Sequence, residues 1–248
     1  WSLGKKKDII LSEQAFEIAL AMVDKKTSPI MWAKIRDNQA TLFETQGRLG
    51  KDAVKFRHAI LAYQEVAGTL GRKVRPHEWC VAWARAALVL YRLGSLEREN
   101  REHYLKKAAD AFEDALTVCD RDVYPARWAE MMNQYGIVLM VLGEYIMNNT
   151  TLEKSVKCFR EALTIRTRIA VPLLWAETAN NLGAAGFALY KRVNKQELLS
   201  EASKCFEGAV EVFSQATGHQ TRVSVINKNL YRVRELLLNE KARKIKSI

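Results

Sequence analysis

The chain has 248 residues, of which 48% are hydrophobic and 27% are charged, and its formal net charge is +11. This composition is that of a folded protein and excludes extensive disorder. Only 12 glycines and 4 prolines occur, which disfavours a turn-rich β fold and favours helices. No run of about eighteen apolar residues is present, so no membrane-spanning helix is expected.

Ten helices are predicted in chain order, with short connections that make consecutive helices antiparallel neighbours. Their expected ranges are 8–25, 29–49, 52–70, 76–93, 98–119, 125–146, 151–169, 172–191, 195–217 and 219–240. They form five repeat units, at about 8–50, 52–94, 98–146, 151–191 and 195–240. No linker divides these units, so a single array over residues 1–248 is expected. Leu3-Gly4 matches Leu49-Gly50, which predicts that the chain begins in the last turn of a helix and is a fragment of a longer protein.

A repeat of 47 to 49 residues decides the architecture. All four prolines belong to this repeat, and each is followed three residues later by a tryptophan. The pairs are Pro29 with Trp32, Pro76 with Trp79, Pro125 with Trp128, and Pro172 with Trp175. Proline suits the first turn of a helix because its missing N–H would have no intrahelical partner there. Each pair therefore marks the start of the first helix of a unit.

An aromatic series runs in step with the prolines. The aromatic positions are Phe16, Tyr63, Phe112, Phe159 and Phe206, each with a small residue four positions before it and an alanine or valine three positions after it. Positions i, i+4 and i+7 share one face of a helix. The small neighbours should therefore let another helix approach closely, while the ring fills the space between them.

The ends of some helices are also predicted. Leu49-Gly50, Leu93-Gly94 and Leu142-Gly143 are expected to end first helices, because glycine past a helix end takes a left-handed conformation at little cost. Thr150 and Glu153 are expected to form a capping box for the helix that follows.

The aromatic second helix, together with Asn-Gln-Tyr-Gly at 133–136 and Asn-Asn-Leu-Gly at 180–183, resembles the tetratricopeptide repeat family. The usual unit of that family is about 34 residues, so the helices here are longer. The resemblance implies an all-α, right-handed superhelical solenoid of about ten antiparallel helices. It also implies a concave groove, lined by the first helices, that binds peptides or folded partners.

Two polar positions recur on the first helices, five and six residues after the tryptophan position. By the resemblance they line the groove: Asp37, Asn38, Arg85, Asn133, Gln134, Asn180, Asn181, Asn227 and Lys228. Amide side chains both donate and accept hydrogen bonds, so they can hold an extended peptide backbone. The same side chains can instead brace neighbouring helices within the solenoid, and both interpretations stay open.

Cations gather towards the C-terminus. The residues predicted to form this basic surface are Arg222, Arg232, Arg234, Lys241, Arg243 and Lys244. Such a surface attracts acidic proteins or peptides, and it can bind nucleic-acid phosphates, or it can be a solvated face. No sequence motif of a nucleic-acid-binding domain is present.

Sequence patterns for catalysis are absent. There is no P-loop, no dinucleotide-binding glycine motif, no HExxH and no G-x-S-x-G. The cysteines, Cys80, Cys119, Cys158 and Cys205, lack metal-site spacing and are expected to be buried free thiols in a reducing cytoplasm. No catalytic residue, cofactor or metal is expected.

The sequence therefore predicts a non-catalytic, cytoplasmic scaffold that binds a protein or peptide, favouring an acidic one. The alternative is a nucleic-acid-binding or sensor segment of a larger protein that acts through its basic surface. No membrane partner is expected, and self-association through the ends of the array is a further prediction.

Overall fold

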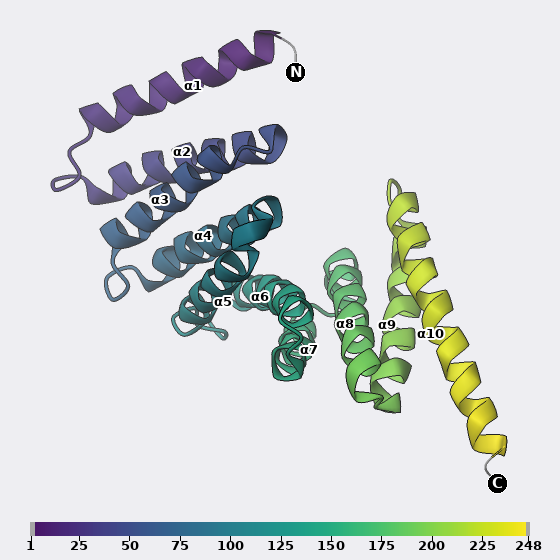
Figure 1. Ribbon diagram of the computed structural model, residues 1–248. Coiled ribbons are helices and arrows are strands. Elements are labelled where there is room, and N and C mark those ends of the chain that lie inside the picture. Colours follow the sequence, from purple (N-terminus) through teal and green to yellow (C-terminus); the bar gives the residue numbers. More distant parts are fainter. Residues whose placement is uncertain (1–2, 247–248) are drawn as a thin grey trace. The chain divides into compact units, whose positions relative to one another are not determined.

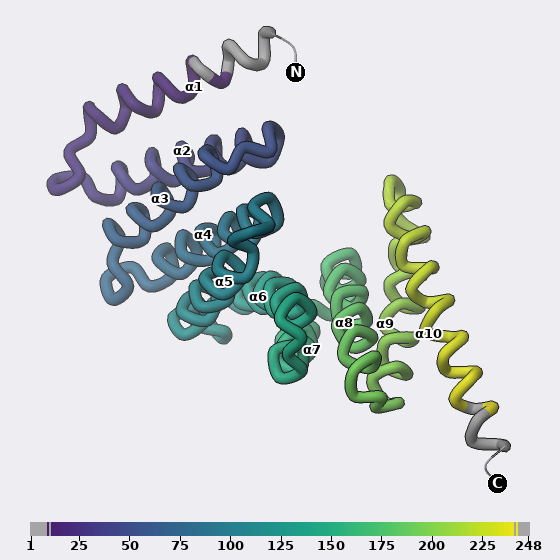
Figure 2. Tube along the Cα trace, viewed as in Figure 1, coloured from purple at the N-terminus to yellow at the C-terminus, as the bar shows by residue number. Residues whose placement is uncertain are grey.

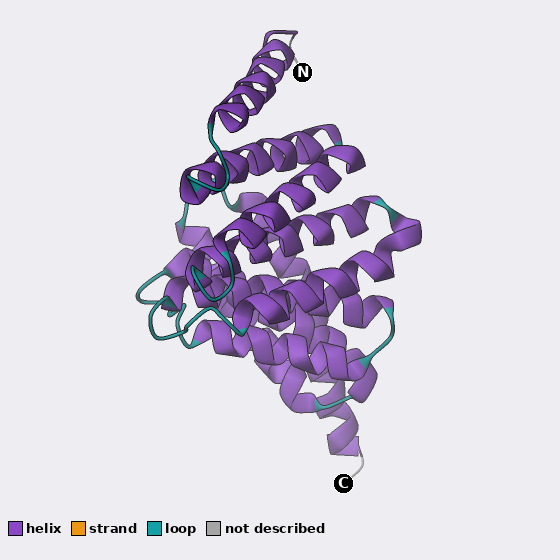
Figure 3. Ribbon diagram, turned by 90° about the vertical axis from the view of Figure 1, so that its left-hand side faces the viewer, coloured by secondary structure: helices purple, strands orange, loops and turns teal. Residues whose placement is uncertain are grey.

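The computed structural model describes residues 3–246, with side chains described for 9, 11–240 and 242. Within residues 3–246 the chain is helical and contains no strand, as Figures 1 and 3 show. The helices are α1 (Leu3–Met22), α2 (Pro29–Gly50), α3 (Ala53–Leu70), α4 (Pro76–Leu96), the 3-10 helix η1 (Arg98–Asn100), α5 (Arg101–Leu116), α6 (Pro125–Tyr145), α7 (Asn149–Leu163), α8 (Pro172–Val193), α9 (Gln196–Gln215) and α10 (Gln220–Lys246). The predicted all-α fold is confirmed. Among the described residues, no helix combines the length and apolar character that crossing a bilayer requires.

The helices group into two compact units. Unit 1 ends at Asp120 and contains α1 to α5, whereas unit 2 begins at Arg121 and contains α6 to α10. Inside each unit, every helix packs against the next one in the chain, which Figure 2 lets the reader follow along the trace. The single array over residues 1–248 stays a prediction.

Proline starts four of the first helices, as predicted. It occupies the first turn of α2, α4, α6 and α8. The second helices begin differently: Asp52 caps α3 by accepting hydrogen bonds from the backbone N–H groups of Val54 and Lys55. Asn148 caps α7 by accepting from the N–H of Thr151 at 2.8 Å. The predicted capping box at Thr150 and Glu153 is therefore wrong, because an asparagine two residues earlier already supplies the cap.

Four members of the aromatic series lie in the core, two in each unit, whereas Phe16 of α1 is only half-buried. Tyr63 and Phe112 of unit 1 are 1% exposed, and Phe159 and Phe206 of unit 2 are fully buried. A glycine on the preceding first helix leaves room for each ring of unit 2. A Cβ atom on Gly136 would lie 2.7 Å from Cε1 of Phe159, which no real contact tolerates. The close approach of first and second helices thus depends on these glycine–aromatic contacts.

The predicted role of glycine at the helix ends is wrong. α4 and α6 continue past Gly94 and Gly143. Instead of ending the helices, these two glycines make room for the next helix. A Cβ atom on Gly143 would lie 2.9 Å from Cγ of Leu152. Gly50 is the last residue of α2, and the left-handed residue is Lys51, with φ of 51°. The helix end expected at Leu3-Gly4 is also wrong, since α1 begins at Leu3.

Two second helices are shorter than predicted. α5 and α7 end at Leu116 and Leu163, several residues before the expected ends at 119 and 169. At each end a threonine hydroxyl donates to a backbone carbonyl three residues earlier: Thr117 to Asp114 at 2.6 Å, and Thr164 to Glu161 at 2.7 Å. Such local bonds compete with continuation of the helix.

Candidate functional site

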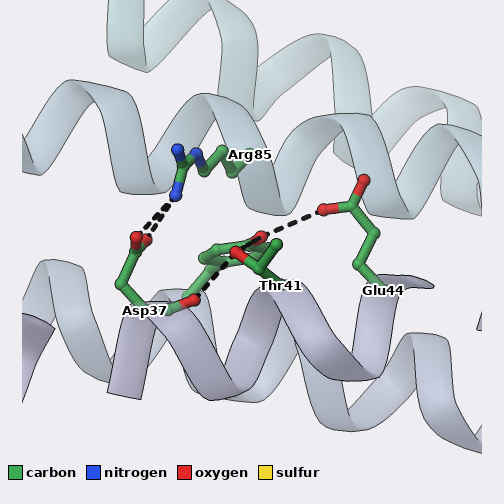
Figure 4. A network of polar contacts seen from close by, with 5 residues as sticks. Asp37, Thr41, Glu44 and Arg85 are labelled. Carbon is green, nitrogen blue, oxygen red and sulfur yellow. Dashed lines mark hydrogen bonds and ion pairs between the residues drawn. The ribbon is translucent and has the colours of Figure 1, made fainter. Parts of the chain in front are cut away.

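The recurring polar residues of the first helices are here called the polar ladder. In unit 1 they form a brace between α2 and α4, shown in Figure 4. Arg85 Nη1 donates to both carboxylate oxygens of Asp37, at 2.7 and 2.6 Å, across a separation of 48 residues. Burial alone would lower the pKa of Arg85, but the charge and hydrogen bonds of Asp37, together with the nearby Tyr63 and Glu44, outweigh it, so that the pKa is raised. The cation of this pair therefore stays charged, and the pair joins two consecutive first helices.

A second contact between α2 and α4 reinforces this brace about two helix turns further along. Arg92 of α4 pairs with Glu44 of α2, again across 48 residues. The buried Tyr63 hydroxyl donates to Glu44 Oε2 at 3.0 Å and lies 3.2 Å from Thr41 Oγ1. Burial and the neighbouring Glu44 raise the pKa of Tyr63, so the phenol stays protonated and able to donate.

A double-mutant cycle on Asp37→Ala and Arg85→Ala is expected to give a coupling energy of about 0.2–1 kcal/mol, because both side chains keep contact with water. Urea unfolding of the four proteins measures it. The pair Lys106 and Glu102, whose side chains are both exposed and lie within one helix, is the control and should couple more weakly. A coupling near zero at Asp37 and Arg85 would contradict the brace.

The ladder of unit 2 is also a brace in part. Asn181 Nδ2 donates to Asn133 Oδ1 at 3.2 Å, and this bond links α6 to α8 over the same 48 residues. Asn133 is completely buried, so it holds the two helices together rather than lining an open groove. Gln134 and Asn180 are half-buried, and in unit 1 Asn38 is exposed.

The open part of the ladder lies on α10. A groove of about 910 Å³ runs along this helix from the end of α9. We name it the α9–α10 groove and define it by Phe213, Val223, Asn227, Lys228, Tyr231 and Arg232. Asn227 and Lys228 were predicted as groove residues and Arg232 as part of the basic surface. The structure brings these three polar side chains together on one helix face.

The α9–α10 groove carries unpaired positive charge. Lys228 and Arg232 are exposed, and neither forms an ion pair with any side chain that the structure describes. The carboxylate of Glu235, at the rim, instead accepts a hydrogen bond from the Tyr231 hydroxyl at 2.8 Å. This bond raises the pKa of Tyr231. The groove therefore presents two free cations beside an aromatic ring that is 64% exposed.

The remaining residues of the predicted basic surface differ in their surroundings. The Arg222 guanidinium lies 4.9 Å from the ring centre of Phe213, at the groove end. Arg234 pairs with Glu207 of α9 at 3.0 Å, which neutralises its charge locally. Lys241, Arg243 and Lys244 lie outside the residues whose side chains the structure describes.

A series of cations stacked on the tryptophans was missed by the sequence analysis. Each cation precedes its tryptophan by seven residues, and this regular spacing could have revealed the series from the sequence. Lys25, Arg72, Arg121 and Arg168 lie over Trp32, Trp79, Trp128 and Trp175, at 4.3, 5.1, 4.8 and 5.4 Å from the ring centres. Two of these arginines also donate to the threonines that end the next second helix, Thr117 and Thr164. Each cation therefore covers the tryptophan of the helix that follows it, and Arg72 and Arg121 also join consecutive second helices.

The cysteines carry no redox or metal chemistry that the structure shows. None of the four is in a disulfide; Cys80, Cys119 and Cys158 are buried, as predicted, and Cys205 is half-buried. Burial raises the pKa of Cys205 to about 12, which keeps it a thiol. Within the described part of the chain, no three histidine, cysteine or acidic residues are placed to hold a metal ion.

The comparisons define this fold as that of a helical repeat protein, an α solenoid. Among solved structures, the chain is similar to BtubC (BKLC) from P. vanneervenii, with 18% identity and a TM-score of 0.63 over 98% of this chain and 91% of that one. Weaker similarities are to the de novo designed helical repeat protein DHR64 (16% identity, TM-score 0.30, 87% and 96% covered) and to the DHF58 filament (14%, 0.35, 92% and 99%). No protein-family model and no curated protein matches the sequence. At this identity the likeness to BtubC shows the fold alone.

Proposed function

We propose that the chain is a non-catalytic, cytoplasmic scaffold that binds an acidic protein segment in the α9–α10 groove. The observation that carries the proposal is the convergence of Asn227, Lys228 and Arg232 on one open groove. The tetratricopeptide resemblance supports it, because helical repeats commonly use such surfaces for peptides. Cysteines outside any disulfide agree with a reducing compartment.

The groove has the chemistry that an acidic peptide needs. The ring of Tyr231 and the side chain of Val223 offer apolar contact, and tyrosine and arginine are the residues that most often dominate binding energy. Asn227 can both donate to and accept from a peptide backbone. Lys228 and Arg232 have no carboxylate partner in the described chain, so an acidic ligand does not have to displace one.

Reversing the groove charges with Lys228→Glu and Arg232→Glu together is expected to weaken binding of acidic peptides by about tenfold or more. The probe is a random twelve-residue peptide library selected on the unaltered chain and labelled with fluorescein. Selected peptides should be enriched in aspartate and glutamate. Fluorescence anisotropy then compares their affinity for the two proteins.

The matched control is Lys26→Glu with Lys73→Glu, two exposed lysines of unit 1, which changes the net charge equally. This control should leave affinity within about twofold, because neither lysine lines the groove. Selection without acidic enrichment, or equal loss in both variants, would overturn the assignment of the groove.

The same variants separate a protein partner from a nucleic acid, because free cations also suit phosphates. A fluorescein-labelled 20-nucleotide DNA, single-stranded and as a duplex, is titrated at low and at physiological salt. Binding that exceeds peptide binding, falls steeply with salt and depends on Lys228 and Arg232 would favour the nucleic-acid alternative instead.

A further inference from the structure

A pocket in unit 1 has no role in the function proposed above. An open pocket of about 450 Å³ is lined by α3, α4 and α5, and its volume is within the range of ligand sites. We name it the α3–α5 pocket. Its apolar lining includes Ile60 of α3 and Leu90 and Leu93 of α4, which are buried, and the ring of Trp83. The exposed Leu61 stands at its edge.

Trp83 adds an aromatic ring to the lining of this pocket. Its indole stacks on Trp79, with ring centres 5.5 Å apart and planes 18° from parallel, which fixes the ring. The Nε1–H group is buried out of reach of solvent and has no acceptor among the described residues. An occupant of the pocket therefore meets the ring of Trp83 rather than its N–H group.

The wall of the pocket offers free carboxylates. Asp110 and Asp114 stand four residues apart on α5, hence on one face of the helix, and both are exposed. Neither forms an ion pair with a side chain that the structure describes. The arginine of the wall, Arg57, is already neutralised by Glu97, which leaves Lys107 as its free cation. The unpaired charge of the wall is therefore negative, in contrast to the α9–α10 groove.

We infer that the α3–α5 pocket is a second peptide-binding site, for a segment with a large apolar side chain followed closely by lysine or arginine. One class of ligand meets both features. The apolar side chain packs on Leu90, Leu93 and Trp83, and the cation pairs with Asp110 and Asp114. The inference does not depend on the proposed function, because it concerns another unit and opposite charge.

The test uses labelled decapeptides with a central leucine and, at the next three positions, either lysine or glutamate. The lysine peptide is expected to bind at least tenfold more tightly, and Asp110→Asn with Asp114→Asn should remove most of that preference. The control Glu17→Gln with Glu99→Gln alters two exposed carboxylates elsewhere in unit 1 and should leave affinity unchanged. Lys228→Glu with Arg232→Glu should also leave it unchanged, which separates this site from the α9–α10 groove.

The indole N–H resonances of the ¹⁵N-labelled chain report on occupation of the pocket. The Trp83 resonance is the one missing in Trp83→Phe, and it should shift as the lysine peptide binds. Should Trp83→Phe not fold, the aspartate variants carry the test alone. Equal affinity for the two peptides, or binding that the aspartate variants do not weaken, would overturn the inference.

Discussion

Phe159→Ala is expected to lower the free energy of unfolding by about 3–5 kcal/mol. The ring is fully buried at the centre of the apolar core of unit 2, and it fills the space above Gly136. Removing it loses the burial of the ring and leaves a cavity, because the backbones on both sides are held by their own helices. Urea unfolding followed by circular dichroism gives the value.

The control is Tyr145→Ala, an aromatic truncation on α6 of the same unit at a side chain that is 46% exposed. Its effect should stay within about 1 kcal/mol, since it opens no cavity. If Phe159→Ala costs no more than this control, the aromatic series does not form the core.

Gly136→Ala is expected to destabilise the chain by about 1–3 kcal/mol, although alanine is the better helix former. The added methyl group would lie 2.7 and 2.9 Å from two atoms of the Phe159 ring, and the tightly packed ring has no room to retreat. The same change in the background of Phe159→Ala should reverse sign. There the methyl group meets no ring, and the gain in helix propensity, up to about 1 kcal/mol, remains.

Gly68→Ala is the matched control for this reversal. Gly68 lies inside α3, and nothing stands within 4 Å of its added Cβ atom. The substitution should therefore stabilise by about 0.5–1 kcal/mol in any background. A Gly136→Ala variant that behaves like Gly68→Ala would contradict the close packing of α6 on α7.

The fold could be predicted largely because its periodic residues act locally. Proline sets the first turn of a helix whatever surrounds it, and a large ring between small residues marks a buried face. The role of Gly94 and Gly143 could not be predicted in this way. A glycine near a helix end serves equally as a left-handed cap or as space for another helix, and only the position of residues such as Leu152 distinguishes the two.

The candidate site could be predicted only in part, for a similar reason. The recurrence of polar residues on the first helices was visible, but their partners were not. Asp37 meets Arg85, and Asn133 meets Asn181, because side chains 48 residues apart face each other across consecutive first helices. On α10 the first of these positions, Asn227, meets no further helix in the described chain and stays open. The packing of the helices therefore decides which of these polar residues brace the fold and which stay open.

Removal of one complete repeat tests the central claim most directly. Deleting residues 148–194 takes out α7 and α8 and joins α6 to α9, so that Phe206 takes the place of Phe159 above Gly136. Deleting residues 148–171 takes out α7 alone and joins two first helices, α6 and α8. If each helix pair is one stacking repeat, the first protein keeps its helicity per residue and melts cooperatively. The second protein loses helicity and no longer melts cooperatively. Equal folding or equal unfolding of the two proteins, measured by circular dichroism, would contradict it.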